Sequence, residues 1–261
     1  MKQLLRSTLS DLTYRAMQLS RKNPRGLRIL MYHRVTDAHP GKRLCVPVAR
    51  FAEQMRWLHE HGYRTITFAQ AVRAASNTDH SKLVVLTFDD GYEDNFIHAA
   101  HIMQRYGFVG TFFVPSAFIA AGPNGHPAED RPMTWQQLKE LAARGHEIGA
   151  HSVSHAKLSR IPQDHVVYEV RRCKEDLETG LEQPVHTFCY PSGDYNRRVR
   201  NIVQANGYAG ACTVEPGANR PGADPFVLTR TEISAFDSLW DFEKKMAGAY
   251  DWLHKVWQWA T

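Results

Sequence analysis

Two adjacent aspartates, Asp89 and Asp90, follow an apolar run and directly precede a glycine. Like charges repel each other at the end of a buried strand, so this pair needs a compensating partner. His151 and His155 lie four residues apart, a spacing that on a helical turn places both imidazoles on one face. Two imidazoles and one carboxylate make the three-ligand set of a catalytic metal site that keeps positions open for water and substrate. One aspartate would then bind the metal, and its neighbour would stay uncoordinated as a base.

A simpler interpretation exists for each half of this pattern. Asp-Asp-Gly is a common turn sequence, and one His-x-x-x-His pair arises readily by chance among 14 histidines. The turn interpretation leaves the histidines unexplained, however. The combination of both halves favours the metal site.

Alternating strand and helix patterns would carry these residues. Apolar, β-rich runs predict strands at 27–32, 83–88, 110–114, 146–150, 186–190, 208–214 and 226–233. Helical patterns that end at a glycine lie between most of them, at 51–62, 93–107, 134–145, 164–180 and 195–207. Such alternation indicates parallel β-α units and an α/β fold. About seven units favour a closed or nearly closed barrel over a doubly wound sheet, although spacing alone leaves both open.

In a barrel of this kind the residues just after each strand meet at one mouth, where catalysis is usually built. The residues that this rule selects are His33, Asp89, Asp90, His151, the turn 191–193 and Arg230. The Pro- and Gly-rich stretch 115–133 is predicted to be a loop over that mouth.

The two ends of the chain are predicted to lie outside the barrel. Residues 1–26 form a basic amphipathic pattern, residues 27–235 make the barrel, and residues 236–261 make a Trp-rich helix packed on it. The N-terminal pattern favours a helix packed on the domain, with contact to a membrane surface as the alternative. The C-terminal tryptophans favour packing over a lid or a membrane-interface belt.

Composition narrows the function classes. A chain of 261 residues with 43% hydrophobic content can bury one sizeable core. The net charge of +5 is mild, and the basic residues gather near the N-terminus, which suggests a nearby anionic surface and no nucleic-acid partner. The four cysteines form no C-x-x-C pair, so we expect reduced thiols. No apolar run resembles a signal peptide or a membrane span, so we expect a cytoplasmic protein. Peripheral contact with the inner face of the membrane is the alternative.

Three motifs in this order, "TFDDGY", "HSVSH" and "FCYPSG", together with "GHEIGAHS", resemble the polysaccharide deacetylase family with its NodB homology domain, a group similar to carbohydrate esterase family 4. The resemblance covers roughly residues 27 to 235. It implies a deformed, TIM-like (β/α) barrel of about seven parallel strands. It also implies removal of N-acetyl groups from amino sugars by metal-assisted hydrolysis.

The resemblance assigns roles to particular residues. Asp89 matches the catalytic base, and Asp90, His151 and His155 match the ligands of one divalent metal, for which we expect zinc because imidazole and carboxylate ligands suit it. A backbone N–H in the turn Tyr190-Pro191-Ser192, that of Ser192, would hold the oxyanion.

Two departures from the family pattern concern the partners of the base. Cys189 and Ser192 stand where many members have an arginine and a tyrosine, so the arginine that normally orients the base is missing. Arg230 could supply that charge from the last strand, and a surface position for Arg230 is the alternative. Where members often have Leu-x-His, this chain has Leu228-Thr229-Arg230, and arginine is no general acid.

His33 is our candidate for the missing proton donor, because a closed barrel brings the first strand beside the last. Exopolysaccharide-type deacetylases look similar here, with Tyr-His after the first strand. The alternative is that His33 is a satisfied polar residue at a strand end.

The predicted function is therefore a metal-dependent N-deacetylase that acts on an N-acetylated glycan, in a polysaccharide or in a lipid-linked precursor. The alternatives are a non-catalytic glycan-binding or scaffold protein that retains the metal site, and a deformylase or small-amide hydrolase on the same fold. A glycoside hydrolase is disfavoured, because its two carboxyl groups need a separation of about 5 Å or more across the sugar. No pattern bears on the oligomeric state.

Overall fold

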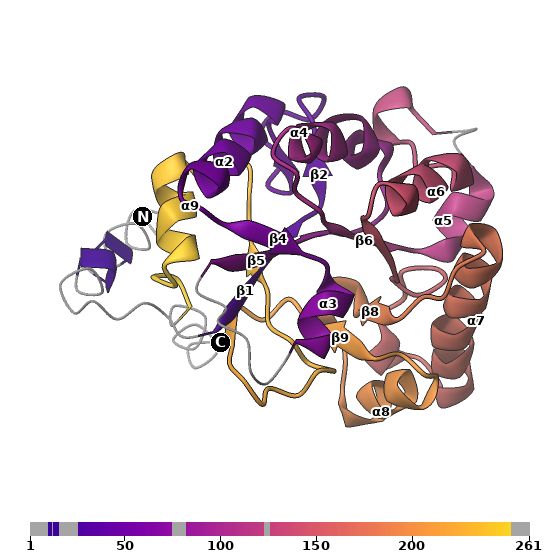
Figure 1. Cartoon of the computed structure of the whole chain (residues 1–261). Coiled ribbons are helices and arrows are strands. Elements are labelled where there is room, and N and C mark those ends of the chain that lie inside the picture. The colour runs from indigo at the N-terminus through magenta and orange to yellow at the C-terminus, as the bar shows by residue number, and fades with distance from the viewer. Residues whose placement is uncertain (1–9, 12, 16–25, 75–81, 123–125, 252–261) are drawn as a thin grey trace.

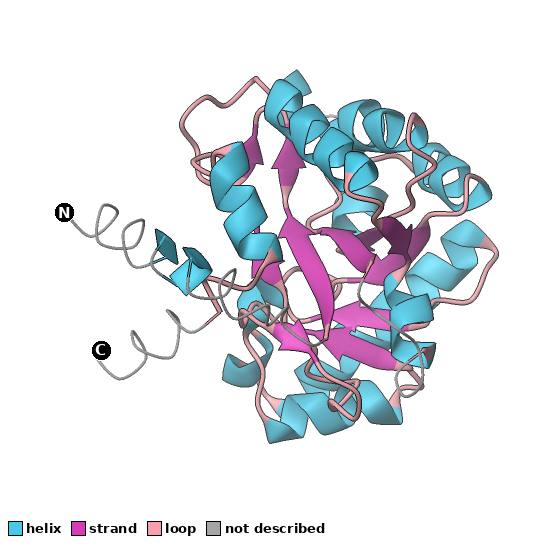
Figure 2. Ribbon diagram, turned by 60° about the vertical axis from the view of Figure 1, so that its left-hand side comes forward, coloured by secondary structure: helices cyan, strands magenta, loops and turns pink. Residues whose placement is uncertain are grey.

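The computed structural model describes residues 10–11, 13–15, 26–74, 82–122 and 126–251. A central sheet is surrounded by helices that cover its outer face (Figure 1). Figure 2 shows the strands running through the middle of the molecule with helices on several sides. This arrangement is that of an α/β barrel, and it positions the strand ends that carry the candidate residues.

The strands of the main sheet are short. They are β1 (Leu27–Tyr32), β4 (Arg64–Ile66), β5 (Leu83–Phe88), β6 (Thr111–Val114), β7 (Glu147–Ala150), β8 (Thr187–Cys189), β9 (Gly210–Cys212), β10 (Ala218–Asn219) and β11 (Thr231–Glu232). Their order is β10-β1-β5-β6-β7-β8-β9, with β11 also beside β1 and β4 beside β5. A separate two-stranded sheet pairs β2 (Arg34–Val35) with β3 (Cys45–Val46).

The segment that contains β11 brings the two edges of the sheet together. On one side, β11 pairs parallel with β1, with Leu30 opposite Thr231. On the other side, Leu228 bridges to Cys212 of β9, and its N–H donates to the carbonyl of Ala211 at 3.0 Å. The first and last strands are therefore neighbours, and the predicted deformed barrel is confirmed.

The sheet differs from the predicted one in three details. The predicted strand 226–233 is regular only at Thr231–Glu232, since it is bent between its contacts to β9 and β1. β10 pairs antiparallel with β1, so the sheet is mixed. β4 was not predicted, because its sequence RTI is only half-buried and carries a short apolar signal.

The helices occupy the positions between the strands. They are α2 (Val48–Glu60), α3 (Phe68–Arg73), α4 (His101–Gln104), α5 (Ser116–Ala121), α6 (Trp135–Ala143), α7 (Gln163–Leu181), α8 (Arg197–Ala205) and α9 (Leu239–Met246). The other helical segments are the π-helix η1 (Asn95–Ala100) and the 3-10 helices η2 (Ala128–Asp130), η3 (Leu158–Arg160) and η4 (Pro191–Gly193).

One predicted helix end is wrong. The pattern ended at Gly180, but α7 continues to Leu181 and the left-handed residue is Glu182, at φ 59°. Gly180 serves close packing instead, because a Cβ there would lie 2.3 Å from the indole ring of Trp135. A glycine near a helix end can thus mark a contact between helices as well as a C-cap.

The strand β5 shows how the sheet divides its side chains. Leu86 and Phe88 belong to the large apolar cluster between the sheet and the helices, whereas Val85 belongs to a smaller cluster on the other face, inside the barrel. Because side chains alternate along a strand, Thr87 and then Asp89 continue the inner face. The alternation therefore aims Asp89 into the barrel at its mouth.

The terminal segments lie largely outside the described residues. Residues 10–11 and 13–15 are helical, and the buried Lys244 of α9 donates to Ser10 Oγ at 3.0 Å and to Asp11 Oδ1 at 2.9 Å. The other residues of the predicted N-terminal helix, and Trp252, Trp257 and Trp259 of the predicted C-terminal helix, are not among the described residues. Among the residues that are described, no helix has the length and apolar character to cross a membrane.

Candidate active site

The Asp89-Asp90-Gly91 turn ends β5 at the mouth of the barrel. Asp89 is 2% exposed, and its backbone N–H donates to the carbonyl of Tyr32 at 3.0 Å, which continues the pairing of β5 with β1. Asp90 and Gly91 both have left-handed backbones, at φ 72° and 70°. A Cβ at Gly91 would lie 2.4 Å from Cγ1 of Val114, so glycine is required there. This tight turn sends the two carboxylates to different partners.

Asp90 meets both predicted metal histidines. Its Oδ1 lies 3.5 Å from His151 Nε2 and 3.3 Å from His155 Nε2, and the two imidazole ring centres are 4.9 Å apart. The three ligand atoms all lie within 4.8 Å of one another. The structure thus brings together the carboxylate and the two imidazoles that the sequence singled out.

The segment from His151 to His155 is a loop, not the helical turn that the spacing predicted. Ser152 and His155 have left-handed backbones, at φ 61° and 60°. Glu169 of α7 holds the loop by accepting the backbone N–H groups of Val153 and Ser154, each at 2.9 Å. Both imidazoles therefore face Asp90 because of loop geometry and not because of helical periodicity.

The atoms of this group fit a divalent cation. The Oδ1 of Asp90 is buried and has no hydrogen-bond partner among the described residues. The Nδ1 of His151 lies 2.8 Å from the carbonyl of Cys189, to which it can only donate, so in the neutral ring the lone pair of Nε2 points toward Asp90. In the absence of a metal, burial raises the pKa of Asp90, but the hydrogen bond and charge of a protonated His151 outweigh it and lower that pKa overall; a cation at Nε2 would take the place of that proton and keep the carboxylate ionised. An unpaired anionic oxygen beside two imidazole nitrogens is the donor set that zinc prefers.

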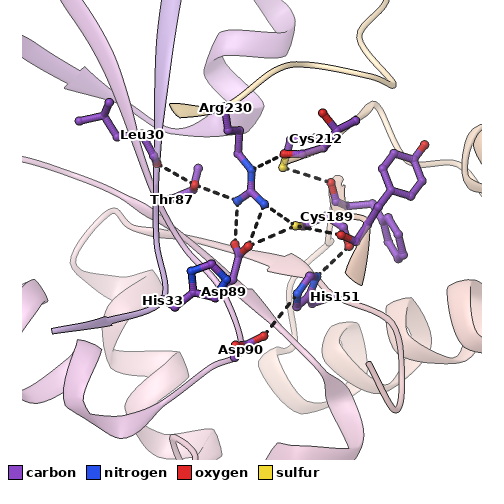
Figure 3. Close-up of polar contacts among 12 residues, drawn as sticks. Leu30, His33, Thr87, Asp89, Asp90, His151, Cys189, Cys212 and Arg230 are labelled. Atoms are coloured by element: carbon purple, nitrogen blue, oxygen red, sulfur yellow. Dashed lines mark hydrogen bonds and ion pairs between the residues drawn. The ribbon is translucent and has the colours of Figure 1, made fainter. Parts of the chain in front are cut away.

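Asp89 has a different environment, shown in Figure 3. Arg230 donates from Nη1 to Oδ1 at 2.7 Å and from Nη2 to Oδ2 at 2.8 Å, which makes a bidentate pair. Burial raises the pKa of Asp89, but the Arg230 guanidinium holds it well below its usual range. Asp89 is therefore ionised and held in one orientation.

Arg230 itself is fixed by the barrel interior. It is 0% exposed, so the surface position considered for it is wrong. Its remaining donors bind the carbonyl of Thr213 at 2.8 Å, Thr87 Oγ1 at 3.0 Å and Cys189 Sγ at 3.0 Å. The small side chain of Cys189 leaves room for the guanidinium to approach from the last strand.

His33 lies next to the two aspartates. It follows β1 directly, its Nδ1 is buried without a hydrogen-bond partner among the described residues, and its charge contributes to the lowered pKa of both Asp89 and Asp90. Figure 3 shows its imidazole beside Asp89. A cavity of about 770 Å³ is lined by both His33 and Asp90. The candidate proton donor and the candidate metal group thus face one space.

The turn 190–192 directly follows Cys189, whose carbonyl contacts His151, but the turn itself makes no hydrogen bond to Asp90 or His155 among the described residues. The Tyr190 hydroxyl donates to the carbonyl of Phe226 at 3.0 Å, and its ring stacks on Tyr195. Pro191 is buried, and Ser192 is exposed with a left-handed backbone at φ 55°. Within the described part of the chain, no ion pair or hydrogen bond joins these three residues to Asp90 or His155. Only their backbone remains as a candidate for substrate contact.

Sequence reasoning missed the loop 36–44 and the role of Cys189 as a contact of Asp89 and Arg230. Lys42, Arg43 and Leu44 line the cavity, as does Phe118 of α5. This loop has neither strand nor helix periodicity, so no pattern marked it. The thiol of Cys189 lies 3.6 Å from Asp89 Oδ2, and the only signal for it was the absence of the usual arginine at that position.

Comparisons with known proteins agree with this geometry. The family model described as "Polysaccharide deacetylase" matches residues 76–211, more than half of the chain. The chain belongs to the polysaccharide deacetylase family. It is 31% identical over 215 residues to the protein named "Putative polysaccharide deacetylase YxkH" of Bacillus subtilis (strain 168), covering 82% of this chain and 73% of that one.

Further relatives extend the comparison within the polysaccharide deacetylase family. The poly-beta-1,6-N-acetyl-D-glucosamine N-deacetylase of Escherichia coli (strain K12) is 27% identical over 261 residues; the match covers 85% of this chain but only 38% of that protein. Among solved structures, the Streptococcus pyogenes deacetylase PplD in complex with acetate has a TM-score of 0.78 at 27% identity, covering 85% of this chain and 99% of that chain. IcaB from Ammonifex degensii has a TM-score of 0.73 at 25% identity, covering 87% and 98%.

Proposed function

We propose that this member of the family is a metal-dependent hydrolase that removes N-acetyl groups from an amino sugar in a polysaccharide or a lipid-linked glycan precursor. The observation that carries the proposal is the separation of two neighbouring carboxylates, one facing two imidazoles and one clamped by an arginine. A binding protein would have no use for the second, ionised carboxylate. The names of two relatives, a putative polysaccharide deacetylase and an N-deacetylase of poly-beta-1,6-N-acetyl-D-glucosamine, support the same reaction class.

Each residue then has a chemical role. Asp90, His151 and His155 would hold one divalent ion, zinc by the chemistry of the donors, which when bound polarises the acetyl carbonyl and acidifies a water. Asp89, kept ionised by Arg230, takes the proton of the attacking water. The backbone N–H of Ser192 would stabilise the oxyanion.

The departing amine needs a proton, and His33 is the proposed donor. Arg230 already pairs with Asp89 and stays charged, so it has no proton to give. A protonated imidazole carries a proton on each ring nitrogen and can donate one of them to the departing nitrogen. The Nδ1 of His33 is buried and has no hydrogen-bond partner among the described residues, so no described protein group there fixes the position of the ring's proton.

The proposal includes a place of action at the inner, cytoplasmic face of a membrane. The basic residues gathered in segment 1–26 would contact anionic lipid there. Sedimentation with vesicles that contain anionic lipid, compared with neutral vesicles, measures this contact. Equal recovery with both vesicle types would remove this part of the proposal.

Acetate release tests the reaction. The purified protein is stripped of metal by a chelator, reloaded with Zn²⁺ or another divalent ion, and incubated with N-acetylglucosamine oligosaccharides and lipid-linked N-acetyl sugars. We expect acetate release that requires the metal. Asp89→Asn should still bind the metal but lose hydrolysis by roughly 10²-fold or more, the usual scale for a positioned base.

The other outcomes separate the competing functions. Release of formate from formylated sugars without release of acetate would indicate a deformylase. Glycan binding without any hydrolysis would indicate a scaffold protein. Full activity of Asp89→Asn would remove Asp89 from the mechanism.

A further inference from the structure

The π-helix η1 begins where the chain leaves the aspartate turn, and its first residue reaches back to His33. Asn95 is 0% exposed, and its Nδ2 donates to the backbone carbonyl of His33 at 2.7 Å. We propose that Asn95 is a positioning residue for His33, which it holds at the mouth of the barrel. The inference rests on the proposed function, because positioning matters only if His33 donates a proton.

The residue before Asn95 secures the other side of the same turn. Asp94 accepts the backbone N–H of Val35 at 3.2 Å and the Nε of Arg34 at 2.6 Å. Asp94 and Asn95 together therefore hold three consecutive residues, 33 to 35, through one carbonyl, one N–H and one guanidinium. We call these two residues the His33 clamp.

The His33 clamp is also connected to the wall of the cavity. The guanidinium of Arg34 continues from Asp94 to Asp130 Oδ1 at 2.5 Å and to the carbonyl of Glu129, in the helix η2. Its ring partner is Tyr92, whose centre lies 4.2 Å from the guanidinium carbon. The segment that carries the metal carboxylate thus sets the positions of both His33 and one cavity wall.

Two features of Asn95 indicate a function beyond packing. π-helices are rare and occur frequently at functional sites, because the extra residue in the turn re-aims side chains. The Oδ1 of Asn95 is buried without a partner among the described residues, a costly state that an apolar side chain would avoid. The amide is used for its single bond to His33.

That bond matters because it holds the backbone from which the His33 ring extends. Among the described residues, Nδ1 of the ring has no hydrogen-bond partner, so the position of the backbone of residue 33 has a large influence on where the imidazole lies. Proton transfer requires a donor within hydrogen-bond reach of the departing nitrogen. Removal of the Asn95 bond should therefore reduce turnover of a substrate whose leaving group needs a proton, and leave its binding unchanged.

The experiment compares two leaving groups in the zinc-loaded protein. Hydrolysis of an N-acetyl amino sugar releases an amine, which must be protonated by the donor. Hydrolysis of an activated aryl acetate ester releases a phenolate, which needs no proton to depart. For Asn95→Leu we expect kcat on the amide to fall by about tenfold, the factor that corresponds to one hydrogen bond, with KM and ester hydrolysis unchanged. Asn95→Ala serves as a second variant if the leucine variant is poorly folded.

Matched variants make the comparison specific. Asn206→Ala removes an asparagine that likewise donates to a carbonyl, that of Ile202 at 2.8 Å, but at the end of α8. It should leave both substrates unaffected. His33→Ala should lower amide hydrolysis and spare the ester, and the double variant His33→Ala/Asn95→Leu should be no slower than His33→Ala alone.

A measurement without turnover accompanies the kinetics. In ¹³C-histidine-labelled protein, the ring signal of His33, assigned by its loss in His33→Ala, should shift in Asn95→Leu and stay in place in Asn206→Ala. Zinc titration calorimetry should give equal affinities for wild type and Asn95→Leu. An unmoved His33 signal would overturn the proposal even if turnover fell.

The outcomes separate this inference from the proposed function. If His33→Ala loses amide hydrolysis but Asn95→Leu does not, the inference is overturned and the donor role of His33 stands. If Asn95→Leu slows amide and ester equally, Asn95 is structural and the inference is overturned. If the wild type hydrolyses no N-acetyl glycan, the proposed function fails, while the His33 signal still decides whether Asn95 holds this side chain.

Discussion

The two ends of strand β7 lie beside two carboxylates, Glu147 at the base of the barrel and Asp90 at its mouth, and the hydrogen bonding of these carboxylates differs. At the base of the barrel, the Glu147 carboxylate accepts from the Ala69 N–H at 2.8 Å and from the hydroxyls of Thr111 at 2.9 Å and Thr187 at 2.6 Å. At the mouth, beyond the other end of β7, Asp90 Oδ1 faces His151 and has no hydrogen-bond donor among the described residues. One carboxylate is satisfied by the fold, and the other is not.

The difference holds beyond these two residues. Five buried side-chain polar atoms lack a partner in the described part of the chain, and four of them belong to residues that follow the mouth ends of β1, β5 and β7: His33, Asp90, Asn95 and Ser152. Folding alone would not leave such atoms unpaired, because each costs about 1–3 kcal/mol. The base of the barrel satisfies its polar groups, whereas the mouth leaves acceptors unpaired, which the proposed cation and substrate would use.

The largest expected effect follows from removing the unpaired carboxylate. Asp90→Ala should abolish measurable metal binding and hydrolysis. This loss is larger than the about 10–100-fold loss of metal affinity or activity that follows removal of a residue that only orients a ligand. The metal-free variant loses the ion pairs to His151 and His155 and places alanine at a left-handed position, so it should lose some stability in urea, but less than removal of the fully hydrogen-bonded Glu147 carboxylate. Zinc titration calorimetry and urea unfolding measure the two quantities.

Glu147→Ala is the matched control from the base. It leaves one buried N–H and two hydroxyls without their acceptor, so we expect a loss of stability of about 3 kcal/mol with zinc affinity unchanged. The proposed difference between base and mouth would be wrong if Asp90→Ala lost as much stability in urea as Glu147→Ala, or if Glu147→Ala lost its affinity for zinc.

The pair of Asp89 and Arg230 combines features of the base and of the mouth. It lies at the candidate site, but it is buried and fully paired like the polar groups at the base. Arg230→Met leaves an unpaired carboxylate in the barrel interior, which costs about 3–5 kcal/mol. Arg230→Met/Asp89→Asn removes the charge and should recover part of that stability, while hydrolysis stays lost. Unfolding in urea at neutral pH measures both variants. Equal stability of the single and the double variant would mean that Arg230 does not compensate Asp89.

How much could be predicted from the sequence depends on how local each signal is. β1 and β5 were predicted with their observed bounds, because continuous apolar runs end at polar residues. The adjacent aspartates and the His-x-x-x-His pair were found because each lies within one short motif. The contact of Arg230 with Asp89 joins residues that are 141 positions apart, and only the assumption of a closed barrel suggested it.

Other features had no usable signal in the sequence. The left-handed loop from Ser152 to His155 depends on Glu169, which lies in the middle of an ordinary amphipathic helix. The π-helix from Asn95 to Ala100 lies within the stretch 93–107 that was predicted as an ordinary helix, and no feature of the sequence pattern marked it. The loop depends on side-chain contacts to backbone atoms, which hydrophobic patterns do not report.

The last prediction concerns His146, which precedes Glu147 at the base. Its Nδ1 accepts the N–H of Gly110 at 3.0 Å, and burial, with a smaller contribution from Arg144, lowers its pKa from 6.5 to about 4. The folded protein therefore favours the neutral ring, so its contribution to stability is complete above pH 6.5 and is lost as the pH falls to about 4. A shift of this size corresponds to about 3 kcal/mol.

His146→Asn keeps an acceptor near Gly110 without a titrating ring, and should lose less stability between pH 7 and pH 4 than the wild type, as measured by urea unfolding at both pH values. Carboxylates that titrate in the same range act in both proteins and cancel in the difference. Identical pH dependence of the two proteins would show that the ring is protonated without cost, and that the base of the barrel is less tightly satisfied than the comparison of the two strand ends requires.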